Sequence, residues 1–225
     1  MRYPGGKGKT FPHVINCMPP HRVYVETHLG GGAVMRRKRP AKESIGIDID
    51  PQVIAARRED LDQPCQLICS NATTWLQQQR FKGDELVYCD PPYLRSTRRS
   101  ERVYRHEMSE QQHIDLLTVL RKLPGPVILS GYASDLYDEL LCDWRTVTFR
   151  SKTHAGVRIE TLWMNFDAPA QLHDYSCLGS NFREREAIRR RVANLQARIE
   201  RLPDVERACL AAWLSERVAD RTGAT

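Results

Sequence analysis

The sequence lacks several features that would place the protein in a specialised class. It contains no apolar run of about 20 residues, the length that a membrane-spanning helix needs. No apolar stretch follows the positive charge near Met1, so we expect no secretory signal peptide and a protein that stays in the cytoplasm. Internal repeats and low-complexity segments are also missing, so the organisation must be deduced from alternating strand and helix patterns.

Paired cysteines are missing as well. The seven cysteines are an odd number, and only Cys65 and Cys69 lie close together in the sequence. A zinc site built from cysteines needs a second pair of this kind. We therefore expect reduced thiols, most of them small core residues, and no metal site.

The composition is that of an ordinary globular protein, with 41% hydrophobic and 28% charged residues. The net charge of +6 permits a polyanionic partner without demanding one. Positive charge is concentrated between Leu94 and His106, where five arginines accompany a single acid, Glu101. These arginines are Arg95, Arg98, Arg99, Arg102 and Arg105. The segment is either a solvated surface loop or a loop that holds phosphates at the mouth of a site.

Strand and helix patterns alternate along most of the chain. Buried strands are predicted at 22–26, 44–48, 66–70, 85–89 and 126–130. Helices are predicted at 33–38, from Pro51, at 73–79, after a capping box of Ser109 and Gln112, and at 134–141. The β-rich runs 144–152 and 157–166, with Gly156 between them, favour a closing hairpin. This order predicts an α/β fold: a Rossmann-like, mainly parallel sheet with a C-terminal antiparallel hairpin strand and a ligand crevice at the strand C-termini.

The composition changes beyond Pro169, which predicts a domain of residues 1–169 and a basic helical extension of residues 170–225. One apolar seam runs through the extension at intervals of four and three residues: Ile188, Val192, Leu195, Ile199 and Leu202. Pro203 ends this helix, and residues 205–218 make a second, so we expect a helical hairpin. Its arginine-rich face either binds nucleic acid or is simply solvated. The seam packs either internally or against another chain, which leaves a monomer or a weak dimer.

A glycine-rich turn and an acid are the first indication of a ligand. Gly30, Gly31 and Gly32 follow the first predicted strand, and Asp48 ends the second. This arrangement is typical of sites for adenosine-containing ligands, because glycines let the backbone approach the ligand and the carboxylate can accept hydrogen bonds from ribose hydroxyls. A glycine-rich turn of any α/β fold looks similar, so this pattern alone decides little.

Asp90, Pro91, Pro92 and Tyr93 follow the fourth predicted strand, where an α/β sheet places its reactive edge. The prolines remove two backbone N–H donors, so carbonyl oxygens and the Asp90 carboxylate remain as hydrogen-bond acceptors. Acceptors that bind the hydrogens of an aromatic amino group favour its nucleophilic form, and Tyr93 offers a flat face on which a base can stack. We expect these four residues to form the wall of a catalytic pocket; the alternative is a turn closed by two prolines.

Four motifs in this order resemble the Dam-type (class alpha) DNA adenine N6-methyltransferases, in particular short versions carried by bacteriophages and prophages. The resemblance covers roughly residues 1–167. The motifs are Arg2 to Lys7, Tyr24 to Glu26 leading to the glycine turn, Asp48, and Asp90 to Tyr93. The resemblance implies the methyltransferase form of the Rossmann-like sheet and S-adenosylmethionine as cofactor. It also implies methyl transfer to the N6 amino group of an adenine flipped out of double-stranded DNA, in a bacterial or phage-infected cell.

The resemblance also implies roles for particular residues. It places Tyr3, Gly6, Lys7, Asp48 and Asp90 in contact with S-adenosylmethionine. Glu26 and the turn from Gly30 to Gly32 would lie beside the methionine moiety, and Asn71 near the adenine. For DNA binding we expect Arg95, Arg98, Arg99 and Arg102.

The chain departs from the family in two places. Thr27 and His28 stand where many relatives have a Pro-Phe pair. Only residues 72–84 separate the third and fourth strands, which is too little for the target-recognition insert of larger relatives. We therefore expect DNA recognition to fall to residues 94–106, the turn at 152–158 and the C-terminal hairpin.

Three other functions share parts of this pattern. Methylation of a cytosine N4 amino group would use the same acceptors. A non-catalytic nucleic-acid-binding protein could retain the fold, although the intact acceptor array argues against it. A nicotinamide-dependent dehydrogenase would share the glycine turn and Asp48 but gives no reason for two prolines after the fourth strand.

Overall fold

The computed structural model describes residues 6–98, 104–153 and 156–222. They form two compact units, one ending at Cys177 and the other beginning at Leu178. The first unit extends past the change of composition at Pro169 because His173 and Asp174 are held inside it. The backbone N–H of His173 donates to the Met18 carbonyl at 2.9 Å, and Asp174 Oδ2 accepts from the N–H of Arg39 at 2.7 Å.

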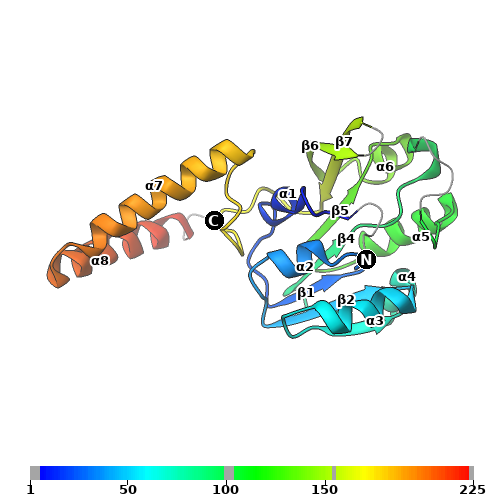
Figure 1. Cartoon of the computed structure of the whole chain (residues 1–225), viewed down its shortest axis with the longest axis horizontal. Helices are drawn as coiled ribbons and strands as arrows, with labels where there is room; N and C mark the ends of the chain where they lie inside the picture. The colour runs from blue at the N-terminus through cyan, green and yellow to red at the C-terminus, as the bar shows by residue number, and fades with distance from the viewer. Residues whose placement is uncertain (1–5, 99–103, 154–155, 223–225) are drawn as a thin grey trace. The chain divides into compact units, whose positions relative to one another are not determined.

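Seven strands of the first unit form one sheet in the order β3-β2-β1-β4-β5-β7-β6 (Figure 1). They are β1 (Val23–Glu26), β2 (Glu43–Asp48), β3 (Gln66–Cys69), β4 (Glu85–Cys89), β5 (Val127–Gly131), β6 (Arg145–Thr153) and β7 (Gly156–Met164). The pairs among β1 to β5 are parallel, whereas β7 is antiparallel to both β5 and β6. The predicted mainly parallel sheet with a C-terminal antiparallel hairpin is confirmed.

Helices precede or connect the strands of the first unit. They are α1 (Phe11–Ile15), α2 (Ala33–Arg37), α3 (Pro51–Asp60), α4 (Ala72–Gln78), α5 (Glu110–Leu120) and α6 (Asp135–Leu140), with a 3-10 turn η1 (Arg95–Thr97) after β4. The capping box predicted before α5 forms, with Ser109 and Gln112 each bonding the backbone of the other. Helix α1 is not predicted from the sequence, because it has five residues and no side chain caps its first turn.

Both faces of the sheet are buried, as expected for parallel strands covered by helices. Because side chains alternate along a strand, Val25 points into one apolar cluster and its neighbour Tyr24 into another. Helices α4, α5 and α6 contribute Leu76, Leu116 and Tyr137 to the first cluster. Helices α1 and α2 contribute to the second. This packing holds the C-terminal ends of β1, β2 and β4 at one edge.

The second unit contains the two predicted helices, α7 (Phe182–Glu200) and α8 (Asp204–Thr222). Asn181 caps α7 by accepting a hydrogen bond from the N–H of Glu184 at 3.0 Å. No residue of α7 is buried. Among the described residues of the chain, no helix has the length and apolar character needed to cross a membrane.

Candidate active site

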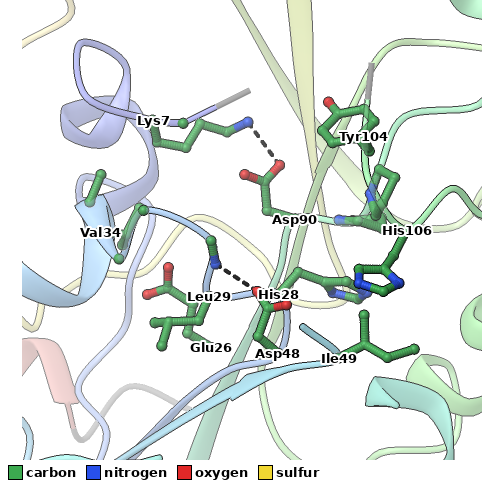
Figure 2. Close-up of a pocket in the computed structure, with 17 residues that line it drawn as sticks. Lys7, Glu26, His28, Leu29, Val34, Asp48, Ile49, Asp90, Tyr104 and His106 are labelled. Atoms are coloured by element: carbon green, nitrogen blue, oxygen red, sulfur yellow. Dashed lines mark hydrogen bonds and ion pairs between the residues drawn. The ribbon is translucent and has the colours of Figure 1, made fainter. Parts of the chain in front are cut away.

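A pocket lies at the C-terminal edge of the sheet, where β1, β2 and β4 end (Figure 2). The strand order reverses at this point, since β1 is followed by β2 on one side and β4 on the other. Open α/β sheets form their ligand crevices at such positions. The lining residues are Gly6, Lys7, Glu26, His28, Leu29, Gly30, Gly31, Gly32, Ala33, Val34, Asp48, Ile49, Asp90, Pro91, Pro92, Tyr104 and His106.

The glycine turn after β1 requires glycine at two positions. Gly30 has φ 45° and Gly32 has φ 62°, both in the left-handed region that other residues rarely adopt. The turn closes with a hydrogen bond from the N–H of Gly32 to the carbonyl of Leu29 at 2.6 Å. Its backbone therefore lies open to the pocket, with no side chain between it and a ligand.

Asp48 is held by backbone amides. Its Oδ2 accepts from the N–H of Gly30 at 2.9 Å, and its Oδ1 accepts from the N–H of Asp50 at 2.9 Å. Burial raises the pKa of Asp48, against the effect of these two bonds. A carboxylate has about four lone-pair positions, so Asp48 retains acceptor capacity toward the pocket.

Glu26 lies at the bottom of the pocket at the end of β1. It is 3% exposed and accepts a hydrogen bond from the hydroxyl of Tyr24 at 2.9 Å. Burial raises the pKa of Glu26 to about 8, although the Tyr24 bond acts in the opposite direction. The Lys38 ammonium lies 4.2 Å from the centre of the Tyr24 ring, and burial lowers the pKa of Lys38 to about 8.

Asp90 belongs to a buried network of charged side chains. Lys7 Nζ donates to Asp90 Oδ1 at 2.8 Å (Figure 2). It also donates to the Tyr93 hydroxyl at 2.5 Å and lies 3.2 Å from Glu160 Oε2. The Tyr93 hydroxyl donates to Glu160 Oε2 at 3.1 Å. Burial opposes the charge on Lys7, but the attraction of Asp90, Tyr93 and Glu160 outweighs it and raises the pKa of Lys7. Burial also raises the pKa of Asp90. The negative charge of Glu160 acts in the same direction, and the positive charge of Lys7 opposes both.

The two prolines and Tyr93 occupy different positions relative to the pocket. Pro91 and Pro92 line it beside Asp90. Tyr93 is 6% exposed, its hydroxyl is bound in the Lys7 network, and its ring packs edge-on against Tyr132 with centroids 4.5 Å apart. In this structure the Tyr93 ring is therefore covered by Tyr132.

The arginines after β4 differ in their surroundings. Arg95 is exposed in η1. Arg98 forms two hydrogen bonds with Glu107, at 3.0 and 2.5 Å, and its side chain is only 5% exposed. Arg105 donates to Asp50 Oδ2 at 2.9 Å, beside the start of α3. Arg99 and Arg102 lie outside the described residues. Thus the Arg95 side chain faces solvent, and that of Arg98 does not.

Comparison with known proteins agrees with this geometry. Residues 54–154 match the family model for D12 class N6 adenine-specific DNA methyltransferases. The match covers the central part of the chain, from α3 to the end of β6. No curated protein matches the sequence significantly.

Solved structures with the methyltransferase fold are similar to the first unit. The N-methyltransferase NodS from Bradyrhizobium japonicum WM9 has a TM-score of 0.52 and 11% identity, over 72% of this chain and 95% of that one. A putative RNA methyltransferase, PH1948 from Pyrococcus horikoshii, has a TM-score of 0.47 and 12% identity, over 72% and 84%. A putative methyltransferase from Streptococcus mutans in complex with SAH has a TM-score of 0.46 and 12% identity, over 73% and 98%. The likeness to NodS shows the fold.

The methyltransferase pocket collects most of the residues expected to hold the cofactor. Gly6, Lys7, Glu26, Gly30, Gly32, Asp48 and Asp90 all line it. Asn71 instead caps α4, with its Oδ1 accepting from the N–H of Thr74 at 3.1 Å. Tyr3 lies outside the described residues.

Several residues of the methyltransferase site are not predicted from the sequence. Tyr104 and His106 line the pocket from the loop after β4, and Glu160 reaches the Asp90 network from β7. His28 also lines the pocket, and burial lowers its pKa to about 3, so the imidazole is neutral at physiological pH. Its Nδ1 lies 3.0 Å from the Thr27 hydroxyl. The residues that replace the family's Pro-Phe pair thus form a polar contact at the pocket wall.

Proposed function

We propose that this methyltransferase transfers a methyl group from S-adenosylmethionine to the N6 amino group of an adenine in DNA. The observation that carries the proposal is the position of Asp90, Pro91 and Pro92. They line the same pocket as the glycine turn and Asp48, so an acceptor wall lies beside an adenosine-type site. The match to the D12 family supports adenine and DNA as the target.

The pocket suits S-adenosylmethionine in shape and in its hydrogen-bond acceptors. The open backbone of Gly30 to Gly32 leaves room for a ligand, and Asp48 has free acceptor positions for ribose hydroxyls. Glu26 and Asp90 add carboxyl oxygens that can accept hydrogen bonds from a ligand. Leu29, Val34 and Ile49 provide apolar surface. When bound, this cofactor supplies the methyl group.

Asp90 acts on the target amino group. Lys7 occupies Oδ1 of Asp90, which leaves Oδ2 to accept a hydrogen bond from the amine. Accepting that bond draws electron density toward the nitrogen and stabilises its developing tetrahedral geometry. Because burial raises its pKa, Asp90 is also a better proton acceptor than an exposed aspartate. Lys7 fixes the orientation of the Asp90 carboxylate during the reaction.

The target must leave the duplex before it can reach this wall, because the amino group of a stacked base is inaccessible to a pocket. For binding the DNA backbone, the exposed Arg95 is better placed than Arg98, whose side chain is almost fully buried. The arginine-rich helix α7 is a further proposed DNA contact. It carries Arg183, Arg185, Arg189, Arg190, Arg191 and Arg198.

Expression in cells whose DNA lacks adenine methylation tests the proposal. Sequencing with modified-base detection should find N6-methyladenine at one recurring motif, and the Asp90→Ala variant expressed at the same level should leave none. N4-methylcytosine instead would favour the cytosine alternative. If no base is modified and purified protein transfers no labelled methyl group to DNA, the chain is a non-catalytic nucleic-acid-binding protein.

A further inference from the structure

The β6–β7 hairpin extends beyond the sheet at its catalytic edge. Strand β5 pairs with β7 only from Gly131, opposite Thr161, to Ile128, opposite Met164. Residues 156–160 of β7 therefore continue past the C-terminal end of β5. They remain paired with β6, from Phe149 opposite Glu160 to Thr153 opposite Gly156. The extension lies at the same edge as Asp90, which follows the C-terminal end of β4.

One face of the extended part of the hairpin, residues 156–160, contacts the network around Asp90. Glu160 binds Tyr93 and Lys7, as described above. Two residues earlier on the same face, the Arg158 guanidinium lies 5.1 Å from the centre of the Tyr132 ring. Arg158 Nη2 also donates to the carbonyl of Thr97 at 2.9 Å. These contacts fix the position of the hairpin relative to Asp90.

The opposite face carries apolar side chains that nothing covers in the described structure. Val157 is 59% exposed and Ile159 is 63% exposed. Neither residue contributes to the two apolar clusters beneath the sheet. Arg150, exposed and paired across the strands with Ile159, adds a positive charge beside them.

We propose that Val157 and Ile159 form a wedge that enters the DNA base stack beside the target adenine and fills the space left when that base moves into the pocket. The inference rests on the proposed function, because it requires a DNA duplex as substrate. Proteins that unstack DNA commonly insert aliphatic side chains between base steps, and the contact thickness of such a side chain is about that of a base.

Charge and geometry favour DNA as the partner of this face. A duplex at the hairpin would place its phosphates near Arg150, and the salt-dependent attraction would hold the strand while the apolar pair contacts bases. Val157 and Ile159 are two residues apart on the strand, a separation of about 7 Å, which is close to the rise of two base steps in a DNA duplex. The wedge and Glu160 occupy adjacent positions of one strand with their side chains on opposite faces, so the hairpin presents the wedge to DNA on one face while its other face contacts the Asp90 network.

The test uses a duplex that contains the methylation motif found by sequencing, and the double variant Val157→Thr, Ile159→Thr. Threonine keeps β-branching but replaces apolar surface with a hydroxyl. Methylation rates are measured on the paired duplex and on a duplex with an abasic nucleotide opposite the target adenine, where the base is easier to extrude. The variant should be slower than wild type by at least about tenfold on the paired duplex, and within about threefold of it on the abasic duplex.

A matched variant, Val157→Ile, Ile159→Val, keeps the apolar volume and should behave like wild type on both duplexes. Cofactor affinity should be unchanged in both variants, since neither residue lines the pocket. An equal loss on the two duplexes, or no loss on either, would overturn the wedge. Absence of methylation by the wild-type protein on any DNA would instead refute the proposed function.

Discussion

The pocket has two sides that are built in different ways. The glycine-turn side consists of Glu26, the glycine turn and Asp48, and its central bond joins Gly30 to Asp48, which are 18 residues apart. The Asp90 side consists of Lys7, Asp90, Tyr93 and Glu160. Its bonds join residues 83 and 67 positions apart.

The difference lies in what holds each carboxylate. The backbone N–H groups of Gly30 and Asp50 hold Asp48. Any sequence that forms the same turns therefore provides these two hydrogen-bond donors. Side chains from the beginning and the end of the first unit hold Asp90, so its environment depends on the complete fold. We infer that the glycine-turn side serves ligand binding and that the Asp90 side sets reactivity, and substitutions of Asp90, Asp48 and Glu160 can test that division.

The largest effect is expected from Asp90→Ala. It removes the acceptor for the amine, so the methylation rate should fall by roughly 10²–10⁴-fold, the range for a lost acid–base group. Single-turnover assays with a labelled methyl donor measure this rate. Calorimetry should find cofactor affinity much less affected. Retention of near wild-type turnover would refute the role of Asp90.

Asp48→Ala should act on the other side of the pocket. It removes hydrogen bonds from a charged acceptor, which predicts an increase of about 10–100-fold in the dissociation constant of S-adenosylmethionine. The rate at saturating cofactor should change little. Asp48→Asn keeps one acceptor oxygen, so its dissociation constant for S-adenosylmethionine should lie between those of wild type and Asp48→Ala. The division between the sides would be broken if Asp48→Ala lowered the saturated rate as strongly as Asp90→Ala.

Glu160→Gln tests whether Glu160 is a positioning residue for Asp90. Loss of its bond to Tyr93 and its attraction to Lys7 should lower the rate constant for methylation by about tenfold, with little change in cofactor affinity. The charge of Glu160 helps to raise the pKa of Asp90, so its removal should lower that pKa. Because Asp90 accepts while ionised, the acid limb of the pH–rate profile should move to lower pH. A rate loss without that displacement would indicate a purely structural role, and Glu160→Asp should restore part of the rate.

The smallest effects on activity should come from two arginines of the loop after β4. Arg95→Ala should weaken DNA binding a few-fold and reduce the salt dependence by about one counterion, because Arg95 is exposed. Arg98→Ala should mainly lower the free energy of unfolding, by about 3–5 kcal/mol, because it removes the two hydrogen bonds and the ion pair that the mostly buried guanidinium makes with Glu107. DNA binding measured over a range of salt concentrations tests the Arg95 variant, and denaturant unfolding tests the Arg98 variant. Equal effects on DNA affinity would show that Arg98 also reaches phosphate.

The sequence predicts what depends on short-range patterns. The parallel strands follow from apolar runs, and the approach of Asp48 to Asp90 follows from the rule that parallel strands end at one edge. Glu160 is not predictable in this way, because its arrival depends on the register of an antiparallel pair, Gly131 opposite Thr161. A one-residue change in that register would turn its side chain to the other face.

Arg98 shows a second limit of sequence reasoning. Its position in a basic stretch suggests a phosphate contact, but an acid nine residues later, Glu107, accepts two of its hydrogen bonds. Composition does not show which arginine of a cluster has an internal partner. Likewise, Asn71 has the residue type expected near a ligand, and in the structure its side chain caps a helix.

The antiparallel register of β7 has a consequence for how related proteins could diverge. Thr161 is fixed opposite Gly131, and Glu160 follows from it directly, so the reactive network is set from the base of the hairpin. Residues inserted between β6 and β7 would lengthen the hairpin without changing that base. The fold therefore combines a reactive network fixed by strand pairing with a hairpin whose length can change without disturbing that network.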